Sequence, residues 1–286
     1  DPDIGRDNLD FWAHDLAYTL EHGGNLGDEG DFFDGDGDGD GDGGADDFSV
    51  VSNPAVPSGL GLAIEGIRRQ GNGMRADVRF NDRRRAGRID GNQVWRDTIE
   101  VAGDVRIGAR ATLTVAPGTL VLMGPDQRAA GLDATLTELV VFGALFVAGG
   151  RDGALFTSAA AVPSPGDWYG IRAPFGSLRL NRVAFEYAST ALSGDLGISD
   201  TVERLDLVTV RKTSGDGIDF HVRGRVDLDK IVVVDAGGTG MRFTGDGQVF
   251  MERFEVSGAA GHGLVREAGS IRCTNCRFLS NGVSSV

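Results

Sequence analysis

An alternating run of aspartate and glycine over residues 34–47 carries the clearest metal-binding pattern in this sequence. A helix–loop–helix calcium loop needs alternating carboxylates, a glycine at its sixth position and a carboxylate at its twelfth. Counting from Asp36 meets this pattern, whereas counting from Asp34 puts Ala45 at the twelfth position. We therefore predict calcium as the cofactor; the alternative is a solvated acidic linker. The predicted ligands are Asp36, Asp38, Asp40, Asp42 and Asp47, with further oxygens from Asp28 and Asp31.

The only two cysteines, Cys273 and Cys276, leave three interpretations open. A zinc site would need a second pair of ligands, which these cysteines lack. They are small core residues, a disulfide that closes the turn at Thr274 and Asn275, or a redox pair. In a secreted protein the disulfide is as reasonable as the core interpretation.

Net charge divides the chain sharply. Residues 1–50 hold 16 acidic side chains and one arginine, whereas the rest of the chain is close to neutral. So many like charges repel one another unless cations lie among them. The sequence has no basic stripe interleaved with aromatics, so nucleic acid is excluded as a partner. No run of about 18 apolar residues occurs, so a membrane-spanning helix is not expected.

A repeat of about 23 residues positions the side chains of residues 178–283. Its equivalent apolar residues are Leu180, Leu205, Leu228, Met251 and Cys273, at steps of 25, 23, 23 and 22 residues. Each repeat closes on a glycine and an apolar residue, at 217–218, 240–241, 263–264 and 282–283. Within a repeat, apolar and charged residues alternate as in a half-buried strand. A fixed period of this size predicts a solenoid, here a parallel β-helix whose coils stack to bury a common core.

The predicted fold is mainly β, with three parts. Residues 1–80 form a small acidic α+β segment, with a helix over 9–21 and a β-hairpin over 59–80 that turns at Gly71–Gly73. Residues 81–93, with the arginine cluster Arg83–Arg85, are expected to be a linker. Residues 94–286 form the solenoid. Both ends of the chain break off within a pattern, so we expect a fragment of something longer.

The segments Ala111–Leu122, Leu145–Gly149 and Gly166–Ile171 resemble the opening coils of secreted bacterial right-handed β-helix proteins. The resemblance covers residues 94–286 and implies a right-handed parallel β-helix that is secreted or displayed on a cell surface. It implies no particular activity, because such domains serve as stalks, adhesins and carbohydrate-active modules.

The stretch Asp15–Phe33, followed by Ser52–Pro54 and the hairpin, is similar to the region after the zinc site in immune inhibitor A-type secreted metalloproteases. That family carries its zinc on a His-Glu-x-x-His helix. None of the four histidines here has that spacing, so we expect no zinc site in this chain. The resemblance implies that a catalytic part precedes Asp1.

Two further motifs resemble sites that act on polysaccharides. Gly215–Asp219 and Gly261–Gly263 are similar to the aspartate pair and Gly-His-Gly of pectin-hydrolysing β-helices, but Asp216 and His262 lie two coils apart, roughly 10 Å. We interpret both as turn residues. Trp168 and Tyr169 either stack on a sugar ring or pack against the edge of a coil.

We expect a non-catalytic region of a secreted or cell-surface protein, in which a calcium-binding segment joins a β-helix stalk or binding domain. The alternatives are a polysaccharide-binding or polysaccharide-degrading β-helix, and an adhesin or filament subunit that associates end to end. A degrading enzyme needs carboxylates beside Arg or Lys across adjacent coils. The outward residues of the repeats are mostly basic and lack acidic partners on the same row. These residues are Arg182, Thr209, Lys230, Arg253 and Arg277.

Overall fold

The computed structural model describes residues 46–48, 62–70, 73–80, 83–125, 133–197 and 203–283. The chain divides into two units at Asp82 and Arg83, with residues 57–59 grouped with the second. Among the described residues all regular structure is β, and no helix is long and apolar enough to cross a membrane.

In the first unit, three antiparallel strands are described: β1 (Asp46–Phe48), β2 (Leu62–Gln70) and β3 (Gly73–Phe80). The pair β2–β3 is the hairpin predicted over 59–80, with Ile64 opposite Val78. The second strand also pairs with β1. The helix predicted over 9–21 lies outside the described residues.

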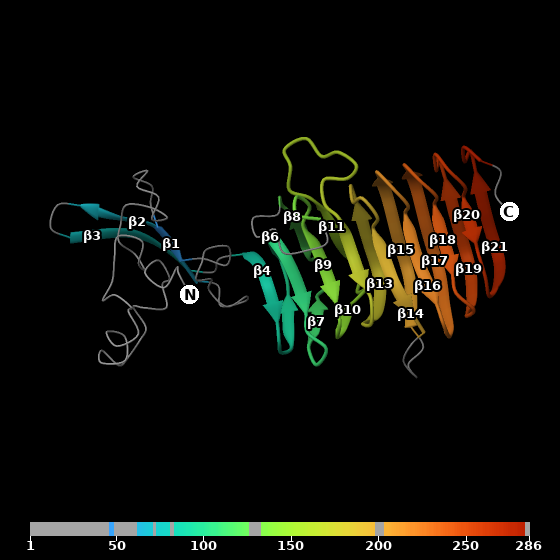
Figure 1. Ribbon diagram of the computed structural model, residues 1–286, viewed down its shortest axis with the longest axis horizontal. Coiled ribbons are helices and arrows are strands. Elements are labelled where there is room, and N and C mark those ends of the chain that lie inside the picture. The colour runs from blue at the N-terminus through green and yellow to red at the C-terminus, as the bar shows by residue number, and fades with distance from the viewer. Residues whose placement is uncertain are drawn as a thin grey trace, which may run out of the picture. The chain divides into compact units, whose positions relative to one another are not determined.

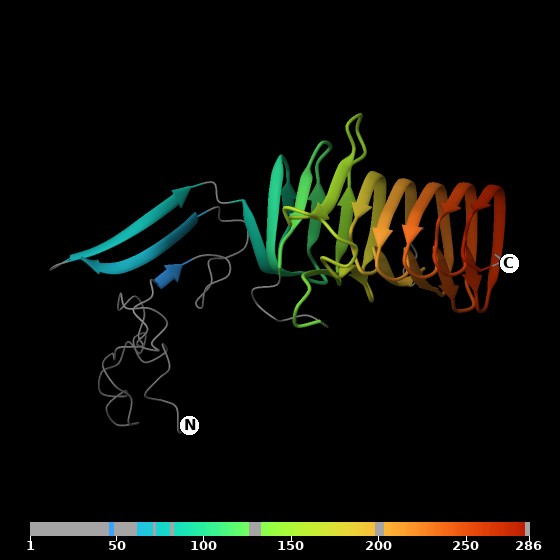
Figure 2. The same ribbon diagram turned by 90° about the horizontal axis from the view of Figure 1, so that it is seen from above.

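The second unit is an 18-stranded parallel β-solenoid, the fold class that the 23-residue period predicts. Figures 1 and 2 show its coils stacked one after another from β4 to β21. The early strands are β4 (Arg84–Ile89), β5 (Gln93–Trp95), β6 (Thr98–Ile107), β7 (Thr112–Val115), β8 (Leu120–Met123), β9 (Glu138–Val141), β10 (Ala144–Val147), β11 (Ala154–Ser158) and β12 (Gly170–Ala173). The later strands are β13 (Ser177–Glu186), β14 (Leu192–Leu196), β15 (Glu203–Thr213), β16 (Ile218–Val222), β17 (Arg225–Ala236), β18 (Met241–Thr244), β19 (Gln248–Ser257), β20 (Leu264–Arg266) and β21 (Ser270–Leu279).

Each coil contributes to three faces. Face A consists of β5, β7, β10 and the first halves of β13, β15, β17, β19 and β21. Face B consists of the first half of β6, then β8, β11 and the second halves of those long strands. Face C consists of the ends of β4 and β6, followed by β9, β12, β14, β16, β18 and β20.

The strand register confirms the alignment of the five repeats. On face A it pairs, in succession, Leu180, Leu205, Leu228, Met251 and Cys273. The first four side chains are at most 2% exposed. Cys273 is exposed, because β19 covers it from one side and β21 is the final strand of the stack (Figure 1). The hydrophobic core is therefore a column of inward side chains, one set from each coil.

The turn between faces A and B uses a left-handed residue in each of the last five coils. These residues are Arg182, Leu207, Lys230, Arg253 and Asn275, with φ between 52° and 57°. A residue in this conformation turns the chain and interrupts the alternation of strand side chains. Consecutive inward positions are therefore three residues apart across the turn, as at Leu180 and Val183. Left-handed geometry costs a non-glycine residue roughly 1–2 kcal/mol, which the inter-coil hydrogen bonds must offset.

The solenoid begins earlier in the chain than the sequence suggested. Residues 81–93 were expected to be a linker, but Arg84–Ile89 is strand β4 and pairs in parallel with β6. Ala86 and Ile89 on this strand are buried. The arginines obscured the strand signal, because only these two apolar side chains mark its inward side.

The glycine turn of the last repeat also differs from its predicted alignment. Gly261 and Gly282 occupy equivalent positions, because Val283 pairs with His262. Gly282 had been aligned with Gly263. The last turn is shorter than the others, which shifts this alignment by two residues.

One buried ion pair links coils on face C. The carboxylate of Glu138 on β9 is fully buried and accepts a hydrogen bond from Nε of Arg172 on β12 at 2.5 Å. The backbone N–H of Glu138 donates to Oδ1 of Asp104 at 2.8 Å. A buried carboxylate needs such partners, because water no longer solvates its charge.

Candidate ligand-binding surfaces of the solenoid

Outward side chains on face A form rows that run from coil to coil, because the parallel register repeats. One row contains, in order, Arg179, Arg204, Asp227, Phe250 and Arg272. Neighbouring members lie on adjacent strands, about 4.8 Å apart. These residues recur at steps of 22–25 residues, so the repeat period itself carries the signal that could have identified the row.

A groove of about 790 Å³ lies over the last coils of face A. Its lining combines three guanidinium groups with carboxylates and one aromatic ring. The principal members are Arg204, Arg225, Asp227, Asp229, Phe250 and Arg272. A concave surface with a few convergent polar groups and an aromatic ring is the usual setting for a bound ligand.

The floor of the groove is fixed by Arg225 and Phe250. The guanidinium carbon of Arg225 lies 4.2 Å from the centroid of the Phe250 ring, a cation–π distance. Nε of the same arginine donates to Oδ1 of Asp227 at 3.0 Å. These two contacts hold the guanidinium over the ring.

Carboxylates on the neighbouring outward row of face A are paired with basic side chains at the A–B turn. Nε of Arg253 donates to Oδ1 of Asp229 at 2.9 Å, and this hydrogen bonding raises the pKa of the Arg253 guanidinium. Lys230 lies 4.0 Å from Asp206 and 3.8 Å from Asp229. The sequence predicted that the outward basic residues lack acidic partners on the same row. The partners of Lys230 and Arg253 do lie one row away. Glu255, however, lies opposite Arg277 in the register, which corrects the prediction for that residue.

A second polar cluster lies on face C. Arg242 on β18 donates from Nε to Oδ2 of Asp216 at 3.0 Å and from Nη1 to Oε1 of Glu267 at 2.9 Å. The hydrogen bond to Asp216 raises the pKa of the Arg242 guanidinium. Asp219 pairs with Arg242 in the register, and its pKa is raised by burial and then by the charge of Asp216. Carboxylates do therefore lie beside an arginine across adjacent coils, which the sequence alone had not revealed.

Asp216 and His262 do not form one centre. Gly215, Gly238 and Gly261 stack on successive coils, so Asp216 and His262 are two coils apart as the repeat predicted. Oδ1 of Asp216 accepts the backbone N–H of Thr239 at 2.7 Å. Both oxygens of Asp216 thus serve the contacts between coils.

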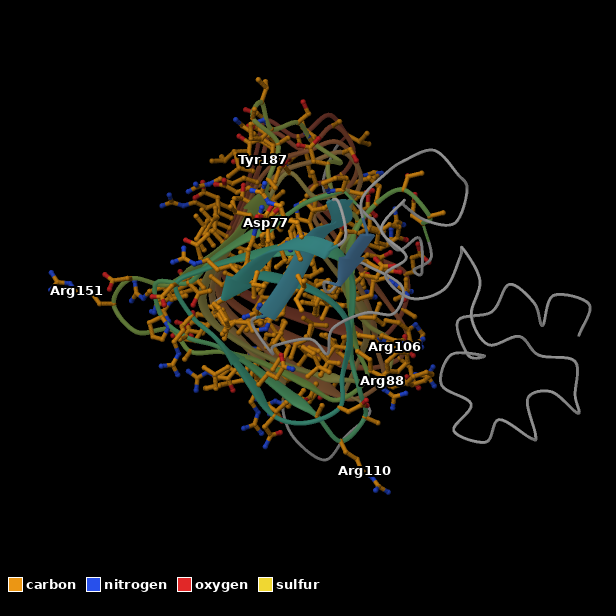
Figure 3. All side chains as sticks on the ribbon, turned by 90° about the vertical axis from the view of Figure 1, so that its left-hand side faces the viewer. Asp77, Arg88, Arg106, Arg110, Arg151 and Tyr187 are labelled. Carbon is orange, nitrogen blue, oxygen red and sulfur yellow. A yellow bond between two sulfur atoms is a disulfide. The ribbon has the colours of Figure 1, made fainter. Side chains whose placement is uncertain are left out.

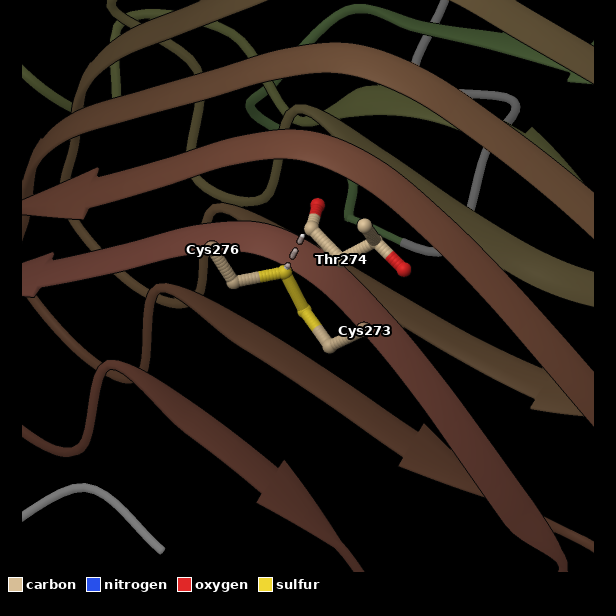
Figure 4. Close-up of a disulfide and its surroundings, with 3 residues drawn as sticks. All are labelled: Cys273, Thr274 and Cys276. Carbon is tan, nitrogen blue, oxygen red and sulfur yellow. Dashed lines mark hydrogen bonds between the residues drawn. A yellow bond between two sulfur atoms is a disulfide. The ribbon is translucent and has the colours of Figure 1, made fainter.

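Cys273 and Cys276 are joined by a disulfide on β21 (Figure 4). They occupy the two inward positions that flank the left-handed Asn275. In the preceding coil these positions belong to Met251 and Phe254. The three-residue spacing of the cysteines is therefore the spacing that the turn between faces A and B imposes in each of the last five coils.

Trp168 and Tyr169 differ in exposure. The Trp168 side chain is fully buried, and its Nε1 donates to the carbonyl oxygen of Glu186 at 2.8 Å. No face of this indole is accessible to a sugar, so Trp168 takes the packing role. Tyr169 is half-buried, with the guanidinium carbon of Arg172 6.0 Å from its ring centroid.

Of the predicted calcium ligands, only Asp47 belongs to the described residues, where it lies in β1. The remaining ligands, Asp28, Asp31, Asp36, Asp38, Asp40 and Asp42, lie outside them. Within the part of the chain that the structure describes, no three His, Cys, Asp or Glu side chains are grouped to hold a metal ion.

No family model, curated protein or solved structure matches the chain. The chemistry of the two outward surfaces is therefore what can indicate a function.

Proposed function

We propose that this chain is a non-catalytic, polysaccharide-binding region of a secreted or cell-surface bacterial protein, built on a right-handed β-helix. The observation that carries the proposal is the groove on face A. It crosses several coils, so an extended polymer could contact the same kind of side chain on each one. Its aromatic ring and hydrogen-bonding side chains suit the apolar faces and hydroxyl groups of sugars.

The pairing of the groove carboxylates supports binding in preference to catalysis. A general acid or base must be able to reach the reacting atoms and exchange a proton with them. Asp227 is hydrogen-bonded to Arg225, and Asp229 to Arg253. Both carboxylates are thus occupied by a hydrogen bond from an arginine.

We expect Phe250→Ala to weaken polysaccharide binding about fivefold or more, because it removes both the stacking surface and the ring that positions Arg225. Affinity electrophoresis of the full chain in gels that contain neutral or acidic polysaccharides measures this. Phe175→Ala is the matched control, since Phe175 is 69% exposed and lies outside the groove. Equal retardation of wild type and Phe250→Ala in every gel would contradict a role for the groove. Reducing-end assays on the same mixtures should show no shortening of the polymer.

The face C cluster favours a second candidate, a polysaccharide-degrading enzyme. Burial and then the charge of Asp216 raise the pKa of Asp219, which is the direction of shift that a general acid requires. New reducing ends that accumulate with the purified chain would favour this candidate over simple binding.

The acidic segment is proposed to bind calcium and to derive from a metalloprotease-like parent. The proposal rests on the spacing of the aspartates from Asp36 to Asp47 and on the resemblance of residues 15–33. A calcium ion among these aspartates would offset two of the fifteen net negative charges of residues 1–50 and so reduce their repulsion.

Calcium should slow proteolysis within residues 28–47 and raise the melting temperature of this segment. Saturation to 100 times the dissociation constant would stabilise the bound form by about 2.7 kcal/mol. Limited proteolysis with calcium and with a chelator measures the effect. Asp36→Asn with Asp38→Asn should abolish it, whereas Asp3→Asn with Asp7→Asn should not. Identical cleavage in all samples would leave the solvated-linker interpretation standing.

A further inference from the structure

We propose that the groove on face A selects acidic polysaccharides, whose carboxylate or sulfate groups bind Arg204 and Arg272. This inference rests on the proposed binding function and adds the chemical class of the ligand. Both arginines are exposed, line the groove and belong to the same outward row.

The balance of charge in the groove leaves these two guanidinium groups available. Asp227 is neutralised by Arg225, and Asp229 by Arg253. Glu252 lies 3.9 Å from Arg253. Within the described part of the chain, neither Arg204 nor Arg272 has an ion-pair partner. The lining holds three arginines and three carboxylates, but Arg225 and Arg253 engage two of these carboxylates. The guanidinium groups of Arg204 and Arg272 are thus left for an anionic ligand.

The positions of the two arginines suit a polymer with spaced charges. Asp227 and Phe250 separate them along the row, so they lie three strands apart, about 14 Å. Between them lies Phe250, whose ring carries the guanidinium of Arg225 on one face. An acidic polymer could place one anionic group at each end and a sugar ring against this arginine–phenylalanine pair.

Arginine is the side chain best suited to this recognition. Its planar fork of donors matches a carboxylate or a sulfate through two parallel hydrogen bonds. Arg179 aligns with Arg204 on the preceding coil and extends the row by one more guanidinium. A longer polymer would therefore gain a further contact beyond the groove, about 4.8 Å from Arg204.

The test compares two polymers that share one backbone. Polygalacturonate carries a carboxylate on each sugar, and fully methyl-esterified polygalacturonate carries none. We expect the full chain to bind polygalacturonate about a hundredfold more tightly, because each of the two arginines adds a charge-assisted hydrogen bond worth about a factor of ten. Biolayer interferometry at about 0.15 M salt, where surface charges are screened beyond about 8 Å, measures both affinities.

The double substitution Arg204→Gln with Arg272→Gln should weaken polygalacturonate binding about a hundredfold and leave binding of the ester nearly unchanged. The matched control is Arg110→Gln with Arg151→Gln, which removes the same charge elsewhere. Figure 3 shows both control side chains pointing away from the solenoid. Because all four arginines are exposed, the melting temperature should stay constant in both double variants.

Three other outcomes would each contradict a different part of the proposal. Equal binding of both polymers, unaffected by Arg204→Gln with Arg272→Gln, would overturn the selection of anions and leave the binding function intact. Absence of binding to these polymers and to a neutral and sulfated dextran panel would overturn the binding function itself. Equally tight binding of poly-L-glutamate, lost in the same double variant, would show that the groove recognises charge and not an acidic sugar.

Discussion

Replacement of Phe220 by alanine should lower the free energy of unfolding of the solenoid by about 3–5 kcal/mol. Phe220 is fully buried on face C, and its ring centroid lies 6.5 Å from that of Phe243 on the next coil. The substitution would leave a cavity between two coils, which backbone hydrogen bonds on both sides prevent from collapsing.

Urea denaturation followed by circular dichroism measures the effect, and hydrogen exchange would locate it in β16 and β18. Site-resolved exchange is needed because long repeat arrays need not unfold in a single step. Phe175→Ala, at an exposed position, should cost about 1 kcal/mol or less. Similar losses for both variants would mean that the core does not run through Phe220.

Replacement of Arg172 by leucine should also cost about 3–5 kcal/mol, because it removes the cation that faces the buried carboxylate of Glu138. A double variant, Arg172→Leu with Glu138→Leu, should recover most of the loss, since the buried carboxylate is then removed together with its cation. The free energies of unfolding of the single and double variants, measured by thermal and urea denaturation, form a double-mutant cycle.

The exposed pair of Arg223 and Asp195 supplies the control for this cycle. Their side chains are 56% and 26% exposed, and Arg223→Leu should cost no more than about 1 kcal/mol. A double variant as unstable as Arg172→Leu alone would show that the packing of Arg172, and not its charge, supports β12.

The column of inward residues could be predicted because it depends only on spacing. Apolar residues equivalent to Leu228 recur at nearly constant steps along the sequence. In a stack of parallel coils, residues separated by one such step lie in contact on adjacent strands. The first coils were harder to delimit, because β4 contributes few apolar side chains and its arginines suggest a linker. Gly282 was misaligned for a related reason, since a shortened turn shifts the pairing without changing the residue types.

The groove could not be predicted from residue types alone. Arg204, Asp227 and Phe250 share no chemical character, so no motif marks them as one row. Only their spacing of 23 residues relates them, and the register converts that spacing into positions on adjacent strands. Ion pairs such as Arg253 with Asp229 escaped notice for the same reason, because the partners lie 24 residues apart in sequence. The burial of Trp168 could not be predicted either, because it depends on the neighbouring coil, where Ala188 pairs with it.

The near-constant length of the last coils also determines how this part of the solenoid would respond to mechanical load. Neighbouring coils hold each other through short ladders of hydrogen bonds, so a force applied along the chain would peel them off singly. Each released coil of 22–25 residues adds about 75–85 Å of extended polypeptide. This part of the chain would therefore lengthen in nearly equal increments and dissipate energy at each one.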